Sequence, residues 1–125
     1  MLIRSERPED AAAIHTLVAA AFASMPFSDG DEAALVDRLR AMGGLSVSLV
    51  AEAAGEIVGH IAFSPAMIDG REGPWYQMAP VSVTPTRQKQ GIGGALIRAG
   101  IAELEALGAE MCLVLGHPDY YPRFG

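Results

Sequence analysis

The chain has 125 residues, of which 50% are hydrophobic and 19% are charged, and its formal net charge is −6. This length predicts a single domain, and this composition excludes an extended disordered protein. The acidic balance argues against a non-specific nucleic-acid binder, which normally presents a basic surface, and suits a cationic partner such as an amine.

Periodic apolar residues in the first half of the chain predict a strand, two helices and a pair of strands. Leu2 to Arg4 is the short strand. The helices are expected after RPED and after ASMPFSDGDE, each with one apolar stripe. The stripes consist of Ile14, Leu17, Val18, Ala21 and Phe22 in the first helix, and of Leu35, Val36, Leu39 and Met42 in the second. The segment LSVSLVAEAAGEIVGHIAFSPAMI then predicts two strands joined by a tight turn at Ala54-Gly55.

The second half of the chain predicts another strand, a helix and a last strand. The segment MIDGREGPWYQMAPVSV contains two glycine turns and ends as a strand in which Val81 and Val83 share a face. The following helix carries Ile97, Ile101 and Leu104 on one stripe. The apolar run EMCLVLG predicts a central strand that is covered on both faces. The order of these elements predicts one α/β domain, residues 1–125, with a mixed sheet.

Residues 81–100, VSVTPTRQKQGIGGALIRAG, place three glycines at the start of this helix. The first amides of a helix have no internal acceptor, the helix dipole adds partial positive charge there, and glycines let the backbone approach an anion closely. The stretch therefore favours a pyrophosphate site, to which Arg87 and Lys89 can add charge-assisted contacts. The dinucleotide fingerprint and the P-loop do not match, and a plain turn with glycines for close packing is the alternative.

The same stretch closely resembles the acetyl-CoA signature of the GCN5-related N-acetyltransferases (GNAT), which is Q/R-x-x-G-x-G/A after a V-x-V-x-P strand end. The matching residues are Val81, Val83, Pro85, Gln88, Gly91 and Gly93. The order of elements is also similar to that of the family over essentially the whole chain. The resemblance implies a GNAT-like fold, with a mixed, mostly antiparallel central sheet and helices on both faces, and it implies acetyl-CoA as the cofactor.

The resemblance also assigns residues to the two parts of the cofactor. By position, the strand segment Val81, Ser82 and Val83 would hold the pantetheine arm. The loop that would cradle the pyrophosphate consists of Arg87, Gln88, Lys89, Gln90, Gly91, Ile92, Gly93 and Gly94.

Acetyl transfer to an amine needs a neutral amine, a polarised carbonyl and a proton for the leaving thiolate, and it needs no metal. His15, His60 and His117 are far apart in the sequence and show no metal-ligand spacing. The end of the chain, GHPDYYPRFG, resembles the Y-x-x-x-G-F segment of the same family, and Tyr121 fits its spacing whereas Tyr120 does not. The resemblance implies that Tyr121 is the general acid. The alternative is that both tyrosines pack against the edge of the sheet.

The general base is left open. Glu32, Glu52, Glu56 and His60 are the options, with a solvated surface position as the preferred interpretation of each, and a water chain is a further option. The acidic loop FSDGDE is our hypothesis for the acceptor pocket, since Asp29 and Glu32 could draw in an amine. Neutral replacements of Asp29, Asp31 and Glu32 should then raise the KM of the acceptor.

The single cysteine, Cys112, cannot form an internal disulfide, which favours a reducing cytoplasm, and we expect it in the core rather than as a nucleophile. The start MLIRSERPED contains no apolar signal core, and no apolar run is long enough to span a bilayer. We therefore expect a soluble cytoplasmic protein with no membrane or nucleic-acid partner.

The sequence ends at Gly125, before the phenylalanine of the family segment, whereas family members usually continue through a helix and two more strands. A chain truncated in this way would leave the edge of its fifth strand uncovered, and we expect either a homodimer through that edge or no stable enzyme. Two functions stay open. One is an N-acetyltransferase that moves an acetyl group from acetyl-CoA directly to a primary amine of a small molecule or protein in a ternary complex. The other is a non-catalytic module that binds acetyl-CoA or CoA as a sensor or degenerate subunit.

Overall fold

The computed structural model describes residues 1–23, 32–66, 70–71, 73–88 and 90–114, without the side chains of residues 32, 79, 111, 113 and 114. Its elements follow the predicted order. They are β1 (Leu2–Ser5), the 3-10 turn η1 (Pro8–Asp10), α1 (Ala11–Phe22), α2 (Glu32–Ala41), β2 (Val47–Ala53), β3 (Glu56–Pro65), β4 (Trp75–Val83), the 3-10 turn η2 (Pro85–Arg87), α3 (Ile92–Ala106) and β5 (Met111–Val114).

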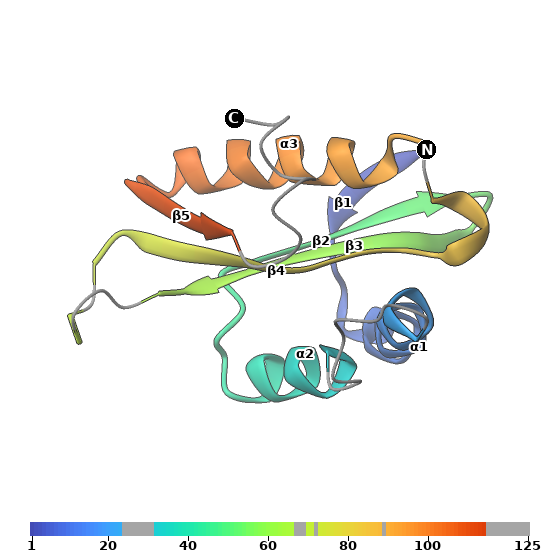
Figure 1. Ribbon diagram of the computed structural model, residues 1–125, viewed down its shortest axis with the longest axis horizontal. Coiled ribbons are helices and arrows are strands. Elements are labelled where there is room, and N and C mark those ends of the chain that lie inside the picture. The colour runs from blue at the N-terminus through green and yellow to red at the C-terminus, as the bar shows by residue number, and fades with distance from the viewer. Residues whose placement is uncertain (24–31, 67–69, 72, 89, 115–125) are drawn as a thin grey trace.

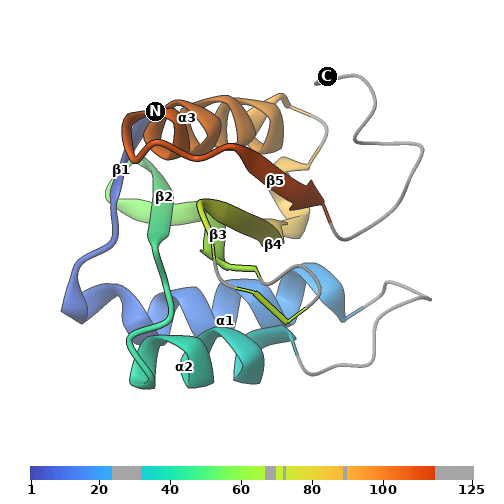
Figure 2. The ribbon, with the colours of Figure 1, turned by 90° about the vertical axis from the view of Figure 1, so that its left-hand side faces the viewer.

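The strands form one sheet that is covered by helices on both faces. The strand order is β1-β2-β3-β4-β5, with antiparallel pairing up to β4 and parallel pairing between β4 and β5. Helix α3 covers one face, and α1 and α2 cover the other (Figures 1 and 2). These features confirm the predicted fold class, a mixed and mostly antiparallel sheet between two helical layers.

Strand β5 lies at the edge of the sheet among the described strands, next to β4. We expected a central position for it from the apolar run EMCLVLG. An apolar run indicates that the two faces of a strand are covered, but it carries no information about the two edges. The run therefore could not predict the place of β5 in the strand order.

The core between α3 and the sheet holds this helix close to the strands. It consists of Val47, Leu49, Ala51, Val58, Ile61, Phe63, Met78, Ile92, Leu96, Ile97 and Leu104. Gly100 faces the ring of Phe63 so closely that a Cβ at this position would lie 2.2 Å from the ring atom Cε2. The absence of a side chain at Gly100 thus lets α3 sit at its observed height above the sheet.

A second core lies between the sheet and the pair α1 and α2. It consists of Ile14, Val18, Ala33, Val36 and Val50, with Phe22 packed against it. The predicted stripe of α1 is therefore confirmed. The assignment of Met42 to the stripe of α2 is wrong, because α2 ends at Ala41 and the side chain of Met42 is 78% exposed. Among the described residues, no helix is both long and apolar enough to cross a membrane.

Candidate active site

Part of the backbone of β4 points away from its antiparallel neighbour β3. The N–H of Thr84 donates to a carbonyl of β3, and hydrogen-bonded pairs alternate along antiparallel strands. Ser82 and His60 therefore form the next hydrogen-bonded pair, whereas Val81 and Val83 occupy the intervening positions. The N–H and C=O groups of Val81 and Val83 consequently point toward the β5 side of β4.

The pairing between β4 and β5 stops before this part of β4. Their register covers residues 75–78 of β4 and residues 111–114 of β5. Beyond it, the register of β4 against β3 shifts in the segment that contains Pro80, which has no N–H to donate. Within the described part of the chain, the backbone of Val81–Val83 thus has no strand partner on its β5 side. We call this segment the open edge.

The chain passes from the open edge into α3 through a turn that ends at Gly91. Gly91 is the N-cap of α3, and its φ of 85° is left-handed, which glycine adopts without strain. Among the described side chains none caps this helix, and its first turn holds no acidic residue. The amides of Ile92, Gly93 and Gly94 lie in that first turn without a helical acceptor. Together with the helix dipole, they form a candidate anion site at the end of the open edge.

Gln88 fixes this turn against the open edge. Its side-chain Nε2 donates to the carbonyl oxygen of Val83 at 3.1 Å. This contact agrees with a Val83 carbonyl that points away from β3. Gln88 and Arg87 are both half-buried, whereas Gln90 is exposed. The predicted cofactor residues that the structure describes therefore lie along one path, from the open edge through the turn to the helix.

The open edge and the first turn of α3 fit the two polar parts of acetyl-CoA. A pantetheine arm carries amide groups that can pair with an unpaired strand edge, as an added strand does. A pyrophosphate matches the amides at the N-terminus of α3. Ser82 differs from its two neighbours, because its backbone pairs with β3 and its buried side chain lies on the same face of the sheet as that of His60.

Several predicted residues lie outside the described part of the chain. They are Lys89 of the cofactor loop, Asp29 and Asp31 of the acidic loop, and Tyr121 and Tyr120 near the end of the sequence. Glu32 begins α2, and its side chain is not described. The acceptor pocket and the general acid therefore stay predictions.

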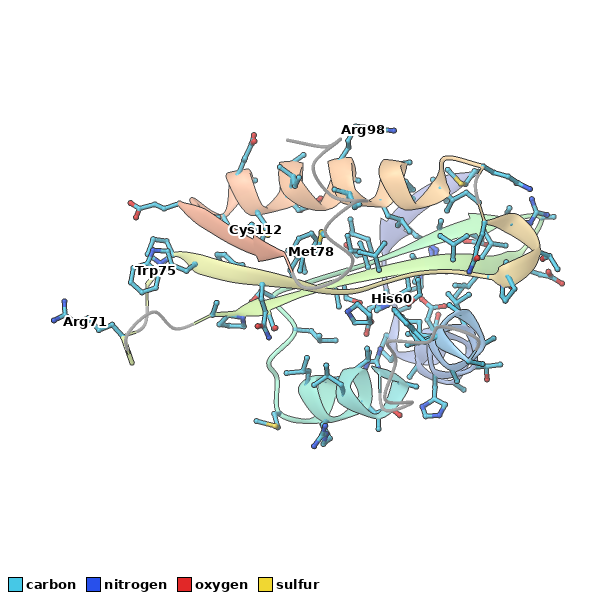
Figure 3. All side chains as sticks on the ribbon, viewed as in Figure 1. His60, Arg71, Trp75, Met78, Arg98 and Cys112 are labelled. Carbon is cyan, nitrogen blue, oxygen red and sulfur yellow. The ribbon has the colours of Figure 1, made fainter. Side chains whose placement is uncertain are left out.

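Sequence reasoning missed a polar cluster on the α1 and α2 face of the sheet, in which His60 is buried and Glu6, Arg40 and Ser48 are half-buried. His60, on β3, is completely buried and lies on the α1 and α2 side of the sheet (Figure 3). Its Nε2 lies 2.8 Å from Oγ of Ser48 on β2. Ser48 also hydrogen-bonds Glu6, and Glu6 accepts two bonds from Arg40 of α2, at 2.8 Å and 2.9 Å. The available signal was the polar character of Ser48 and His60 within otherwise apolar strands.

The structure describes the side chains of three of the four candidates for the general base, Glu52, Glu56 and His60. Glu56 is exposed, which confirms the surface interpretation, while Glu52 is half-buried and accepts a bond from Nε of Arg4 at 2.9 Å. For His60 the surface interpretation is wrong, because α1 and the sheet enclose it.

Cys112 is partly buried and packs against the core on the α3 side of the sheet. Burial raises the pKa of its thiol, which favours a packing role. Within the described ranges, no group of three or more His, Cys, Asp or Glu is placed to hold a metal ion.

Comparison with known proteins places this chain among acetyltransferases. Residues 11–120 match the acetyltransferase (GNAT) family. The uncharacterized N-acetyltransferase YhbS of Escherichia coli K12 is 38% identical over 126 aligned positions, which cover 100% of this chain and 72% of that protein. A GNAT family acetyltransferase from Brucella melitensis, solved in complex with acetyl-CoA, is 52% identical with a TM-score of 0.96 and covers 99% of this chain and 80% of that one. The YhbS structure from Escherichia coli in complex with CoA is 37% identical with a TM-score of 0.90 and covers 99% of this chain and 67% of that one.

Proposed function

The chain belongs to the acetyltransferase (GNAT) family, and on this premise we propose that it transfers an acetyl group from acetyl-CoA directly to a primary amine within a ternary complex. Acetyl-CoA supplies the acetyl group as an activated thioester, and its use as the cofactor agrees with the acetyl-CoA complex of the Brucella relative. The acceptor is a small-molecule or protein amine.

The observation that carries this proposal is the path from the open edge to α3. The backbone groups of Val81 and Val83 would hold the pantetheine arm. The amides of Ile92, Gly93 and Gly94 would hold the pyrophosphate. With the pyrophosphate at α3, the arm would run back along β4 toward the irregularity around Pro80, where β4 and β5 cease to pair.

The acceptor side of the proposal rests on residues predicted from the sequence. In the sequence, Asp29 and Asp31 lie between α1 and α2, the two helices that cover one face of the sheet, and Glu32 begins α2. We propose that an amine enters from this face and that Tyr121 protonates the leaving thiolate. A cytoplasmic location is part of the same proposal, because a single cysteine is compatible with a reducing compartment.

Calorimetric titration of acetyl-CoA tests the cofactor site. We expect saturable binding by the wild type and its loss in Gly91→Glu, because the new carboxylate repels the pyrophosphate. Gly108→Glu is the matched control, since Gly108 follows the other end of α3, has a φ of 80° against 85° at Gly91, and offers equal free space for a Cβ. Equal loss of binding in both folded variants, or no binding by the wild type, would contradict the proposed site.

Release of free thiol from acetyl-CoA in the presence of amines tests turnover. We would offer tyramine, spermidine and a peptide with a free N-terminus. Tyr121→Phe should lower kcat by about 100-fold without changing the affinity for acetyl-CoA, because it removes the proton donor to the thiolate. Tyr120→Phe is the matched control and should retain kcat. The general-acid assignment fails if the two variants behave alike.

A further inference from the structure

In the polar cluster around His60, the donor and the acceptor of each hydrogen bond can be assigned. Ser48 Oγ donates its only proton to the carboxylate of Glu6, so this oxygen is an acceptor toward its other neighbour. That neighbour is Nε2 of His60 at 2.8 Å, and Nε2 must therefore carry the ring proton. The other ring nitrogen, Nδ1, is then left with a lone pair and can accept a proton.

Two buried side-chain atoms in the described part of the chain have no hydrogen-bond partner, and they belong to facing residues. They are Nδ1 of His60 and Oγ of Ser82. The two residues are register partners on β3 and β4, and both side chains lie buried on the α1 and α2 face. Directly opposite residues have Cβ atoms about 5 Å apart, so rotation of the serine can bring its hydroxyl to the imidazole. Nδ1 of His60 lacks a donor, and the hydroxyl of Ser82 lacks an acceptor.

The groups around His60 favour a neutral imidazole before the reaction and can stabilise a transient imidazolium during it. Burial lowers the pKa of His60, although Glu6, 3.8 Å from Nε2, favours the protonated form. Arg40 holds Glu6 from α2, and Asp37 lies at 3.4 Å from the same arginine and 2.6 Å from the exposed His15 of α1. Otherwise α1 presents apolar residues to this face, Ile14 and Val18 among them. Glu6 can thus stabilise a transient imidazolium.

We propose that His60 and Ser82 form a buried proton relay that receives the proton lost by the acceptor amine during acetyl transfer. This inference rests on the proposed function. Ser82 lies in the middle of the open edge, and its side chain is buried on the α1 and α2 face. The relay therefore requires the amine to bind at this face, next to Ser82. His60 is a positioning residue in this scheme, because it acts through Ser82.

The relay moves one proton and leaves the electron count unchanged. As the amine nitrogen bonds to the acetyl carbon, the C–S bond of the thioester breaks and its electron pair leaves on sulfur, as the thiolate that Tyr121 protonates. One N–H bond of the amine also breaks, and its electron pair stays on nitrogen. The proton goes to Oγ of Ser82, and the hydroxyl proton of Ser82 goes to Nδ1 of His60, where a new N–H bond forms. The resulting imidazolium keeps its Nε2–H bonded to Ser48, next to the carboxylate of Glu6.

Long-range nitrogen–proton NMR correlations on the ¹⁵N-labelled chain test the resting state without any need for activity. The signals of the histidines are assigned with single His→Gln variants. We expect His60 as the neutral tautomer protonated at Nε2, and a changed Nδ1 shift in Ser82→Ala. Ser64→Ala is the matched control, because Ser64 is a buried serine on the same face that already bonds Gln77. A tautomer protonated at Nδ1, or equal effects of the two serine variants, would overturn the relay.

The pH profile of kcat with the best amine among tyramine, spermidine and the peptide tests the relay during turnover. The wild type should lose activity as the pH falls and His60 becomes protonated. His60→Gln should lower kcat by about 100-fold and lose this acid limb, with unchanged acetyl-CoA affinity. Ser82→Ala should act in the same direction and Ser64→Ala should not, which decides the question even if His60→Gln fails to fold. If His60→Gln is active and shows the same loss of kcat at low pH as the wild type, the relay is overturned but the proposed function is not. If the wild type binds acetyl-CoA but acetylates no amine, the proposed function and the relay are overturned together.

Discussion

Two glutamines, one on β4 and one in the turn after it, each donate a hydrogen bond from Nε2, but the two bonds have different roles. Gln88 Nε2 donates to the Val83 carbonyl at 3.1 Å, and Gln77 Nε2 donates to Oγ of Ser64 at the same distance. The first bond ties the cofactor loop to the open edge, while the second joins two neighbouring strands within the sheet. At the residue scale, the partner of the amide thus decides whether the bond supports a binding site or the sheet itself.

We expect Gln88→Ala to weaken acetyl-CoA binding and leave the fold intact. The loss of one hydrogen bond that positions the loop corresponds to about 1 kcal/mol, or roughly a fivefold rise in Kd. Titration calorimetry measures it, with Gln77→Ala as the control, which removes an equivalent bond away from the loop. Equal affinity of Gln88→Ala and wild type would show that the loop keeps its geometry without this bond.

At the scale of elements, the position of α3 depends on two glycines that allow close contact between this helix and the sheet. Gly100 lies against Phe63, and a Cβ at Gly59 of β3 would come 2.9 Å from Cδ1 of Leu96. One glycine therefore belongs to the helix and the other to the sheet, and together they bring the two elements close. This approach fixes the N-terminus of α3 beside the end of β4, where the candidate anion site lies.

Gly100→Ala should reduce the free energy of unfolding by about 1–3 kcal/mol, because the new methyl group overlaps the Phe63 ring. Phe63→Leu should recover part of that loss when the two changes are combined, since it removes the ring atoms that clash. Urea denaturation of the single and double variants gives the coupling energy. Simple additivity of the two effects would mean that α3 shifts to avoid the contact.

At the scale of the whole molecule, buried charges connect elements that are distant in the sequence. Arg4 of β1 bonds Asp10 at 2.8 Å, and this bond lowers the pKa of Asp10. Burial alone would raise the pKa of Glu6, but its bonds with Arg40, His60 and Ser48 lower it well below its ordinary value. These contacts join the first residues of the chain to α2 and to the sheet.

The folded chain should lose stability in two steps as the pH falls. Burial lowers the pKa of His60 in the folded chain. Below about pH 6.5, the unfolded chain therefore binds a proton at His60 more readily than the folded chain does, and stability falls. Below about pH 4, Glu6 and Asp10 act in the same direction, since their folded pKa values lie below those of free carboxyls.

Urea midpoints measured by circular dichroism from pH 8 to pH 3 follow both steps. His60→Gln should abolish the first decline and retain the second. His15→Gln, which removes a half-exposed histidine from α1, should keep both. A wild type that is as stable at pH 5 as at pH 8 would contradict the assignment of the first step to His60.

The local structure on which the proposed cofactor site rests could be predicted from the sequence, because most of its requirements are local. Gly91 and Gly93 follow a strand and begin a helix, and the candidate anion site needs only that backbone conformation and the free amides of the first turn. Apolar patterns likewise predicted the described strands and α-helices, but not the two 3-10 turns, and they predicted helical faces that pack in the cores. It could not predict that Met42 lies past the end of α2 and is exposed.

The relay could not be predicted, because its members meet only through tertiary contacts. Glu6 and Arg40 are 34 positions apart, and Ser48 and His60 are 12 apart, so no local pattern links them. His60 is buried because α1 packs over β3 and β4, and the register of those strands sets it opposite Ser82. The sequence by itself determined the elements, the cofactor signature and the family resemblance, since these follow from residue type and spacing. The tertiary structure decided which polar groups lose their water and face one another, because burial depends on the packing of elements from across the whole chain.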